Sequence, residues 1–373
     1  MVAYRSPTMR AAAVIACLMI IVLLTISFGH GTAESVDLAR VKWLGSLSSS
    51  FIRPMIPNNV HITYLKKEPT SIIHFGFDSF LSLYSAYYHM KGVRLFLHTD
   101  YSPEEIFQAQ NSLNRTDKWT TLALNMPNLE IHYVVAPNRT TNNVEISLVQ
   151  HKSDFVRMDA IKQYGGTYMD TDVYVLRDFT PLRAAGFQNV VGREPIWGHV
   201  NNGIWMSQPN TTMVNVFIQA SHEFFDGGWN TVSSIMFRRI AERLHRYPFE
   251  VLILDERAWF PTNWQGESVD KLFEPFLDSG ASPAATTDVG PDDVDPYQWW
   301  RLALKPKKDN EMDFSGSYAI HSFVHHHPDV KNFDGLTPEY VLARQSNFAR
   351  ALYAPVRHAF EAGLFSADDF DIE

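Results

Sequence analysis

Residues 153–172 restrict the folds open to this chain more than any other segment. Apolar residues recur there at helical spacing as far as Tyr164. Gly165 and Gly166 then stop the helix, because glycine readily takes the left-handed backbone that ends helices. A short stretch at 167–169 follows at once and predicts a strand. A helix that returns directly into a strand is typical of an α/β fold.

Strands and helices alternate along the rest of the chain in the same way. Apolar runs predict further strands at 72–75, 93–98, 131–135, 189–192 and 203–207, and helices at 80–90, 147–164, 212–225 and 231–246. Alternation of this kind gives a mostly parallel sheet with helices on both faces. We therefore expect one large α/β domain over residues 71–373. Ligands of such sheets bind beyond the carboxyl ends of the strands.

The N-terminal part contains an almost uncharged apolar stretch at residues 11–29, preceded by two arginines. About 20 apolar residues span a bilayer, and a positive flank tends to stay in the cytoplasm. We expect residues 1–10 to be a cytoplasmic tail, 11–29 a transmembrane signal-anchor, and 30–70 a stem before a lumenal domain. The alternative is a cleaved signal peptide with its small-residue site at 31–33, which would release a secreted protein.

The charge balance argues against a nucleic-acid partner. The formal charge is −9 and the isoelectric point is near 5.9, whereas nucleic-acid binding needs clustered lysine and arginine. Three glycosylation sequons, at Asn114, Asn138 and Asn210, agree with lumenal residence. The single cysteine, Cys17, lies in the apolar stretch, so the chain has neither an internal disulfide nor a cysteine metal site.

Two carboxylates, Asp170 and Asp172, follow the strand predicted at 167–169. In an extended chain, side chains two residues apart point the same way, so both can hold one cation. A hard ion such as Mn²⁺ or Mg²⁺ takes oxygen ligands and completes its shell with phosphate oxygens and water. The pair therefore indicates a site that neutralises a diphosphate leaving group. An Asp-x-Asp alone is common in solvated turns, so the surrounding pattern decides.

Asp154 and Arg157 lie three residues apart, and hence on one face of the preceding helix. An aspartate and an arginine in this position can hydrogen-bond sugar hydroxyls and a phosphate. The alternative is a surface ion pair, which contributes only a few tenths of a kcal/mol. Next to the aspartate pair, the functional interpretation is the stronger one.

The helix, glycine pair, strand and aspartates together, from residue 153 to about 182, resemble the DXD-containing sugar-binding region of glycosyltransferase family 32. Weaker similarity to the same family extends over segments 71–76, 201–207, 258–264 and 318–323. The resemblance implies a GT-A-type fold, a single Rossmann-like domain, and transfer with retention of anomeric configuration. It also implies a Golgi membrane enzyme that moves a hexose from UDP-hexose or GDP-mannose to a glycan or glycolipid hydroxyl, with Mn²⁺ or Mg²⁺ as cofactor.

The same resemblance assigns roles to individual residues. The catalytic set would be Asp170, Asp172 and Arg157. The donor would contact Asp154, Arg157, Tyr164, Gly166, His74 and Asn202. The metal would be held by Asp170, Asp172 and His321. Phe323 replaces a tryptophan usual in the family, and the Gly-Pro expected near 232–233 is absent, so the donor sugar stays open.

Two other functions compete with this interpretation. A phosphohydrolase with an aspartate nucleophile also places Asp-x-Asp after a strand, but it usually has a small hydroxyl or branched residue where Tyr174 stands. A non-catalytic lumenal sugar-binding or partner subunit would keep the fold without the transfer. The intact set of Asp154, Arg157, Asp170 and Asp172 argues against that second alternative.

Overall fold

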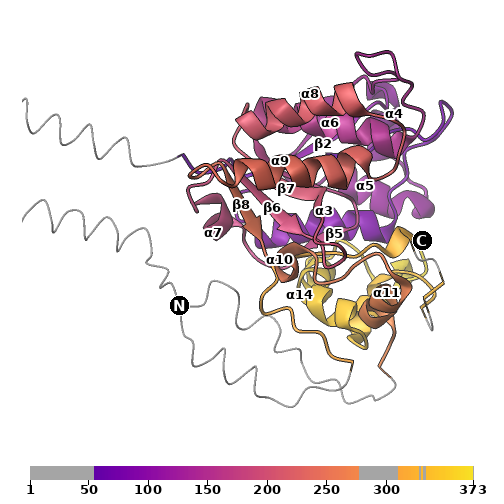
Figure 1. The fold of residues 1–373 in the computed structure, drawn as a ribbon. Helices are drawn as coiled ribbons and strands as arrows, with labels where there is room; N and C mark the ends of the chain where they lie inside the picture. Colours follow the sequence, from indigo (N-terminus) through magenta and orange to yellow (C-terminus); the bar gives the residue numbers. More distant parts are fainter. Residues whose placement is uncertain (1–53, 277–309, 327–328, 331–332, 373) are drawn as a thin grey trace, which may run out of the picture. The chain divides into compact units, whose positions relative to one another are not determined.

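The computed structural model describes residues 54–276, 310–326, 329–330 and 333–372 (Figure 1). The predicted tail, the anchor segment at 11–29 and most of the predicted stem lie outside these described residues. Among the helices of the described ranges, none combines the length and the apolar content needed to cross a bilayer.

A seven-stranded sheet forms the centre of the described fold, in the order β3-β2-β1-β4-β7-β6-β8 (Figure 1). Its strands are β1 (Asn59–Thr63), β2 (Arg94–Thr99), β3 (Leu129–Tyr133), β4 (Gly166–Met169), β6 (Asn189–Arg193), β7 (Val200–Ser207) and β8 (Val251–Leu254). Strand β1 is parallel to β2 and β4, β2 to β3, and β6 to β8. Strand β7 runs antiparallel to its neighbours β4 and β6. The α/β class and the mostly parallel sheet are therefore confirmed.

A second, two-stranded sheet follows directly from the first. Strand β5 (Val173–Val175) comes just after β4 and pairs antiparallel with β9 (Ala319–His321). The α-helices are α3 (Phe77–His89), α4 (Pro103–Gln110), α5 (Lys118–Leu124), α6 (Val149–Tyr164), α7 (Thr180–Arg183), α8 (Thr212–Phe224), α9 (Phe237–Leu244), α10 (Glu256–Trp259), α11 (Gly266–Phe273), α13 (Pro338–Ala343) and α14 (Asn347–Glu361). Short helical turns are η1 (Arg115–Asp117), the π-helical η2 (Thr231–Met236), η3 (Val324–His326) and η4 (Ala367–Asp369).

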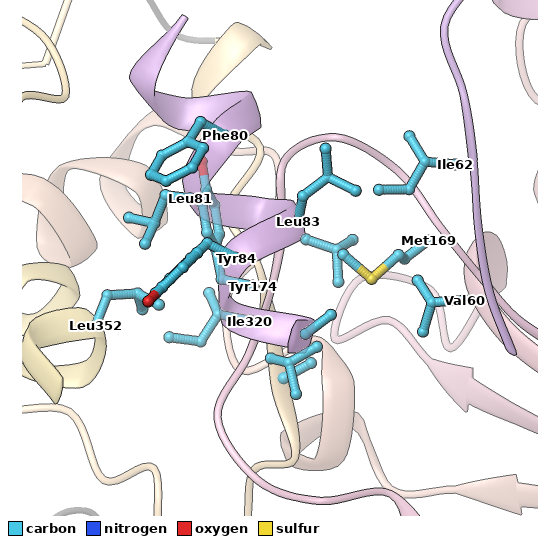
Figure 2. Close-up of a cluster of buried hydrophobic side chains, with 14 of the residues drawn as sticks. Val60, Ile62, Phe80, Leu81, Leu83, Tyr84, Met169, Tyr174, Ile320 and Leu352 are labelled. Carbon is cyan, nitrogen blue, oxygen red and sulfur yellow. The ribbon is translucent and has the colours of Figure 1, made fainter. Parts of the chain in front are cut away.

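Successive strand residues pack into two different hydrophobic clusters, one on each face of the large sheet. On β4, Tyr168 packs in the cluster that includes α6, α8 and α9, whereas Met169 packs in the cluster that includes α3 and α14. On β7, Trp205 joins the first cluster and Ile204 the second. This is the period-two alternation of a sheet covered on both faces. Figure 2 shows where α3 meets β1 and the β5–β9 pair, through Val60, Ile62, Leu81, Leu83, Met169, Tyr174 and Ile320.

Most predicted elements are present near their expected positions. The predictions at 80–90, 93–98, 147–164, 167–169, 189–192, 203–207 and 212–225 correspond to α3, β2, α6, β4, β6, β7 and α8. The strand predicted at 131–135 begins and ends two residues earlier, as β3. The helix predicted at 231–246 starts as the π-helix η2 and continues as α9.

The predicted start of the domain at residue 71 is wrong. The segment predicted as the first strand, 72–75, is not a strand, and Ile72 is 86% exposed. The first strand is instead β1, which lies within the predicted stem and pairs on both sides in the middle of the sheet. Its polar residues gave it the appearance of a linker. In the fold they are buried with partners: Asn59 Nδ2 donates to the Tyr164 carbonyl at 3.2 Å, and the His61 ring bonds to the Gly165 carbonyl at 2.8 Å.

Candidate active site

Three predicted metal ligands meet where the two sheets join. Asp170 and Asp172 lie in the turn between β4 and β5, and His321 ends β9, where it pairs with Val173. One ligand atom from each of the three residues lies within 4.8 Å of the others. The local geometry differs from the prediction, because the chain leaves β4 in a turn, with the Val173 amide donating to the Asp170 carbonyl at 3.1 Å. We call Asp170, Asp172 and His321 the carboxylate–histidine cluster.

The donor atoms of this cluster suit a divalent cation. Two carboxylates and an imidazole form the mixed oxygen and nitrogen set that Mn²⁺ accepts. His321 is 4% exposed; its Nε2 lies 3.1 Å from Asp172 Oδ1, and its Nδ1 has no hydrogen-bond partner among the described residues. Burial lowers the pKa of His321, but the nearby Asp172 and Asp170 outweigh burial and leave that pKa above its usual value. The cluster therefore attracts positive charge, and residues of these types fit a metal ion.

Arg157 fixes the orientation of Asp170 from helix α6. Its Nη2 lies 3.1 Å from Asp170 Oδ1, and its Nη1 donates to the Asn202 carbonyl at 3.1 Å. The guanidinium stacks 4.2 Å from the centre of the Tyr168 ring, and the Tyr168 hydroxyl donates to the same Asp170 oxygen at 2.8 Å. A planar guanidinium that is stacked and hydrogen-bonded at once has little freedom to move. Asp170 is therefore held in one orientation from two sides.

Asp154 supports Arg157 from within the protein. Asp154 is 7% exposed, accepts a hydrogen bond from Asn202 Nδ2 at 2.9 Å, and lies 3.5 Å from Arg157 Nε. Burial raises the pKa of Asp154, while Arg157 and Asn202 oppose that rise. The surface ion pair considered as an alternative is thus excluded, since both partners are buried. Asp154 and Asn202 are turned toward each other, so they position Arg157 in this structure.

Gly203 allows strands β4 and β7 to meet at the cluster. The Asp170 amide donates to the Gly203 carbonyl at 2.8 Å, which aligns the turn with β7. A Cβ at Gly203 would lie 2.7 Å from Asp170 Oδ2 and 2.7 Å from His321 Cε1. Real Cβ atoms essentially never come so close to other atoms, so this position requires a residue without a side chain.

Three predicted donor contacts are not brought to the cluster. Tyr164 and Gly166 lie at the amino end of β4, whereas Asp170 follows its carboxyl end, about 13 Å away at roughly 3.3 Å per residue. Gly166 there allows close packing on the Asn59 backbone, with a Cβ position 2.6 Å from the Asn59 carbonyl oxygen. Tyr164 and Gly166 pack against β1 in this structure, and their donor roles stay predictions. His74 has an exposed side chain in the segment before α3, and its carbonyl accepts a hydrogen bond from Tyr64.

Other polar residues near the cluster were not predicted. Glu194 is 5% exposed, accepts a hydrogen bond from Asn201 Nδ2, and helps raise the pKa of His321. It directly follows the carboxyl end of β6, which is the position where ligand-binding residues of α/β sheets are sought. His325 Nε2 lies 3.3 Å from Asp78 Oδ2 at the start of α3. No local pattern marks that pair, because the two residues are far apart in sequence.

Comparison with known proteins points to one family. Residues 85–191 match the family model described as the glycosyltransferase sugar-binding region containing the DXD motif. This match includes α6, the glycine pair and the two aspartates. A curated relative, "Glucan organizing enzyme 1" of Cryptococcus neoformans var. grubii serotype A, is 28% identical over 233 residues. The aligned region is 59% of this chain, and the chain spans 58% of the length of that relative.

Among solved structures, the chain is similar to the PaToxG glycosyltransferase, with 12% identity and a TM-score of 0.35 over 85% of this chain and 95% of the other. It is also similar to the apo form of the glycosyltransferase GlyE of Streptococcus pneumoniae, with 10% identity and a TM-score of 0.39 over 84% of this chain and 65% of the other. The family match includes Asp170 and Asp172 of the cluster, whereas His321 lies outside the matched residues. We conclude that residues 85–191 resemble the sugar-binding region with a DXD motif that glycosyltransferases of this family carry.

Proposed function

We propose that the chain transfers a hexose from a nucleotide-sugar donor, UDP-hexose or GDP-mannose, to a hydroxyl of a glycan or glycolipid. The main support for this proposal is the carboxylate–histidine cluster at the carboxyl end of β4. Arg157 of α6 holds Asp170 of this cluster in place. A GT-A-type Rossmann-like domain is the fold that the proposal assumes. The printed name of the curated relative, a glucan organizing enzyme, favours a glucan among the acceptors.

In this proposal Asp170, Asp172 and His321 hold Mn²⁺ or Mg²⁺. A divalent ion at such a site neutralises the charge that develops on a departing diphosphate. Arg157 keeps Asp170 aimed into the site and adds a fixed positive charge close to it. Preorganised charges of this kind are usually the largest contribution to such a transfer, because they need no rearrangement during the reaction. Asp154 and Asn202 hold Arg157 in place.

For the sugar itself we propose front-face attack by the acceptor hydroxyl, with retention of anomeric configuration. The acceptor oxygen then forms the new glycosidic bond on the face that the diphosphate leaves, and its proton passes to the leaving phosphate. The competing route is a double displacement, which needs a carboxylate nucleophile. Glu194 is the candidate for that nucleophile, because it is buried close to His321. A glycosyl adduct on Glu194, trapped and located by mass spectrometry, would replace front-face attack by a covalent mechanism.

We propose a Golgi location, with residues 11–29 as a single type II membrane anchor and the catalytic domain in the lumen. The sequence supports this through the apolar stretch and its positive flank. The asparagines of the three sequons, Asn114, Asn138 and Asn210, all have exposed side chains, as glycosylation in the lumen requires. Secretion after cleavage near 31–33 is the alternative, and the size of the mature chain distinguishes the two.

The test is release of nucleoside diphosphate by the full chain from a panel of UDP- and GDP-sugars, with Mn²⁺ and with EDTA. We expect release from one donor, its loss on chelation, and at least a 100-fold loss in Asp172→Asn, because removal of one key electrostatic group costs about that much. The exposed Asp334→Asn is the matched control and should keep full activity. Donor binding with no release under any condition, even with acceptors present, would favour a non-catalytic sugar-binding protein.

A further inference from the structure

Two tryptophan rings face solvent near the carboxyl edge of the large sheet. Trp197 lies between β6 and β7 and is 67% exposed; Trp264 lies between α10 and α11 and is 40% exposed. Their ring centres are 6.2 Å apart, with 49° between the ring planes. We call Trp197 and Trp264 the tryptophan pair. Two large aromatic side chains left exposed together on adjacent loops mark a candidate binding surface.

The backbone holds Trp197 in an unusual conformation. Trp197 and Gly198 have φ angles of 56° and 60°, and a bulky residue rarely takes this left-handed conformation. Arg238 Nη1 donates to the Trp197 carbonyl at 2.8 Å, and Arg193 Nη1 donates to the Gly198 carbonyl at 2.8 Å. Both arginines are held by Glu242, at 3.1 Å and 3.0 Å. Unfavourable backbone conformations persist where the surrounding structure enforces them, and they concentrate at ligand sites.

Hydrogen bonds link both loops of the tryptophan pair to the carboxylate–histidine cluster, directly for the Trp264 loop and through Gly203 for the Trp197 loop. The Trp197 loop begins at Glu194, which accepts a hydrogen bond from Asn201 Nδ2, and Asn201 Oδ1 accepts from the Gly203 amide at 2.6 Å. The Trp264 loop contains Thr262, whose hydroxyl donates to the His321 carbonyl at 2.7 Å. These hydrogen bonds fix the position of both tryptophan loops relative to the cluster.

The strand pairing also sets the distance between the tryptophan pair and the cluster. Asp170 is level with Gly203 on β7, and Arg193 of β6 is paired with Val200. The three residues from Gly203 back to Val200 span about 10 Å at roughly 3.3 Å per residue, and Trp197 lies beyond them. A ligand that reaches both places must be extended. The pair therefore suits a part of the acceptor remote from the hydroxyl that reacts.

Polar groups surround the tryptophan pair on one side. A cavity of about 290 Å³ is lined by His199, Ile235, Arg238, Arg239 and Glu242. The His199 ring lies 5.5 Å from the Trp197 ring, so the cavity and the pair adjoin. An aromatic surface next to hydrogen-bonding groups matches a pyranose ring, which has an apolar C–H face and a rim of hydroxyls. A purely apolar partner would take the Arg238–Glu242 ion pair out of water and offer it no hydrogen bonds in exchange.

We propose that Trp197 and Trp264 form an acceptor subsite, on which pyranose rings of a saccharide chain stack. The best fit is a gluco-oligosaccharide, because rings with all hydroxyls equatorial expose axial C–H bonds on both faces. The axial 2-hydroxyl of mannose interrupts one of those faces. This inference rests on the proposed transferase function, and it assigns the acceptor class to the same site. Trp197 and Trp264 are specificity residues here, and the clamp of Glu242, Arg193 and Arg238 positions Trp197.

The test uses the full chain with cellohexaose, laminarihexaose and mannohexaose as probes. Binding is followed by intrinsic tryptophan fluorescence, and transfer by nucleoside diphosphate release with the active donor. In Trp264→Ala we expect the Kd and the KM for the bound glucohexaose to rise about tenfold or more, because tryptophan is enriched among the contact residues whose truncation costs most affinity. Donor hydrolysis without acceptor should stay unchanged, and Trp264→Phe should restore part of the affinity.

Two further variants keep the test decisive. Glu242→Gln loosens the clamp without touching either ring, and we expect it to raise the same KM with donor hydrolysis unchanged. Trp229→Ala, which changes another half-exposed tryptophan, is the control and should alter neither constant. Equal hexasaccharide affinity in wild type and Trp264→Ala, or no binding of either glucohexaose at millimolar concentration, would overturn the subsite. Absence of donor release with intact saccharide binding would instead overturn the proposed transfer and leave the subsite standing.

Discussion

Gly203 packs against both Asp170 and His321, and it has no side chain. A methyl group there would lie 2.7 Å from Asp170 Oδ2 and 2.7 Å from His321 Cε1, so both side chains or the Gly203 backbone must shift. Misplacing a reacting group by about 1 Å can lower a rate by roughly 100-fold. We therefore expect Gly203→Ala to weaken Mn²⁺ activation of donor hydrolysis by about that factor. Activity should be measured over a Mn²⁺ titration, alongside the thermal midpoint.

The matched control for this change is Gly316→Ala. A Cβ at Gly316 would meet its nearest neighbour, Arg257 Cβ, at 3.8 Å, which is ordinary van der Waals contact. The same glycine-to-alanine change should therefore leave Mn²⁺ activation intact. If Gly203→Ala kept wild-type Mn²⁺ dependence with an unchanged thermal midpoint, then Asp170 and His321 would not need their present spacing, and the assigned cluster would be in doubt.

At the residue scale, the sequence predicted the groups that carry charge but not the groups that place them. Asp170, Asp172 and His321 are brought together as expected, although a turn rather than an extended strand does this. Gly203 could not be found, because its role is visible only when two strands and β9 are assembled. Glu194 could have been found, since a charged residue after a predicted strand end is a recognised signal.

At the scale of elements, a buried histidine pair lies where α6 covers strands β1 and β2. His61 Nε2 is 2.8 Å from the Gly165 carbonyl and must donate to it, so His61 Nδ1 accepts from His98 Nε2 at 2.9 Å. Burial lowers the pKa of His61 to about 4. Burial and the neighbouring His61 ring lower the pKa of His98 to about 3. Both rings are therefore neutral in the folded protein. The two nitrogens that face each other, His61 Nδ1 and His98 Nε2, share one hydrogen bond.

This pair predicts an acid-sensitive fold. In the unfolded chain His61 takes up a proton near pH 6.5, whereas in the folded protein it does so only near pH 4. The free energy of unfolding therefore decreases as the pH falls from about 6.5 to about 4. A lowering of about 2.5 pKa units corresponds to roughly 3 kcal/mol for His61 alone. Urea unfolding between pH 7 and 4 measures this loss. His61→Gln keeps a donor for the Gly165 carbonyl without titrating and should flatten the pH dependence.

The surface variant His74→Gln is the control, because that side chain is exposed, and it should keep the wild-type slope. An equally steep loss of stability in His61→Gln would assign the acid sensitivity to other groups. The histidine pair also explains why the sequence did not predict β1 as a strand. Its polar residues pair with backbone carbonyls and a second histidine that only the assembled sheet supplies, so a strand of the core read as part of a stem.

At the scale of the whole molecule, the position of β1 determines where the folded unit begins. The strand order β3-β2-β1-β4 places β1 between two parallel neighbours, with Val60 and Ile62 in the core. Its removal would leave β2 and β4 with unpaired edges and would open a cavity below α3. Each lost core side chain of this kind typically lowers the free energy of unfolding by 2–5 kcal/mol, and the total stability of a domain is only about 5–15 kcal/mol.

Two fragments test this argument directly. A fragment that starts at residue 54 keeps β1 and should be soluble and unfold cooperatively in urea. A fragment that starts at residue 71, the boundary expected from the sequence, should be insoluble or lack a cooperative transition. Soluble yield and the urea transition by circular dichroism are the measurements. Cooperative unfolding of the 71–373 fragment at the same midpoint would mean that β1 is dispensable. The domain boundary would then return to the position that composition indicates, with the central sheet pairing of β1 contributing little to the fold.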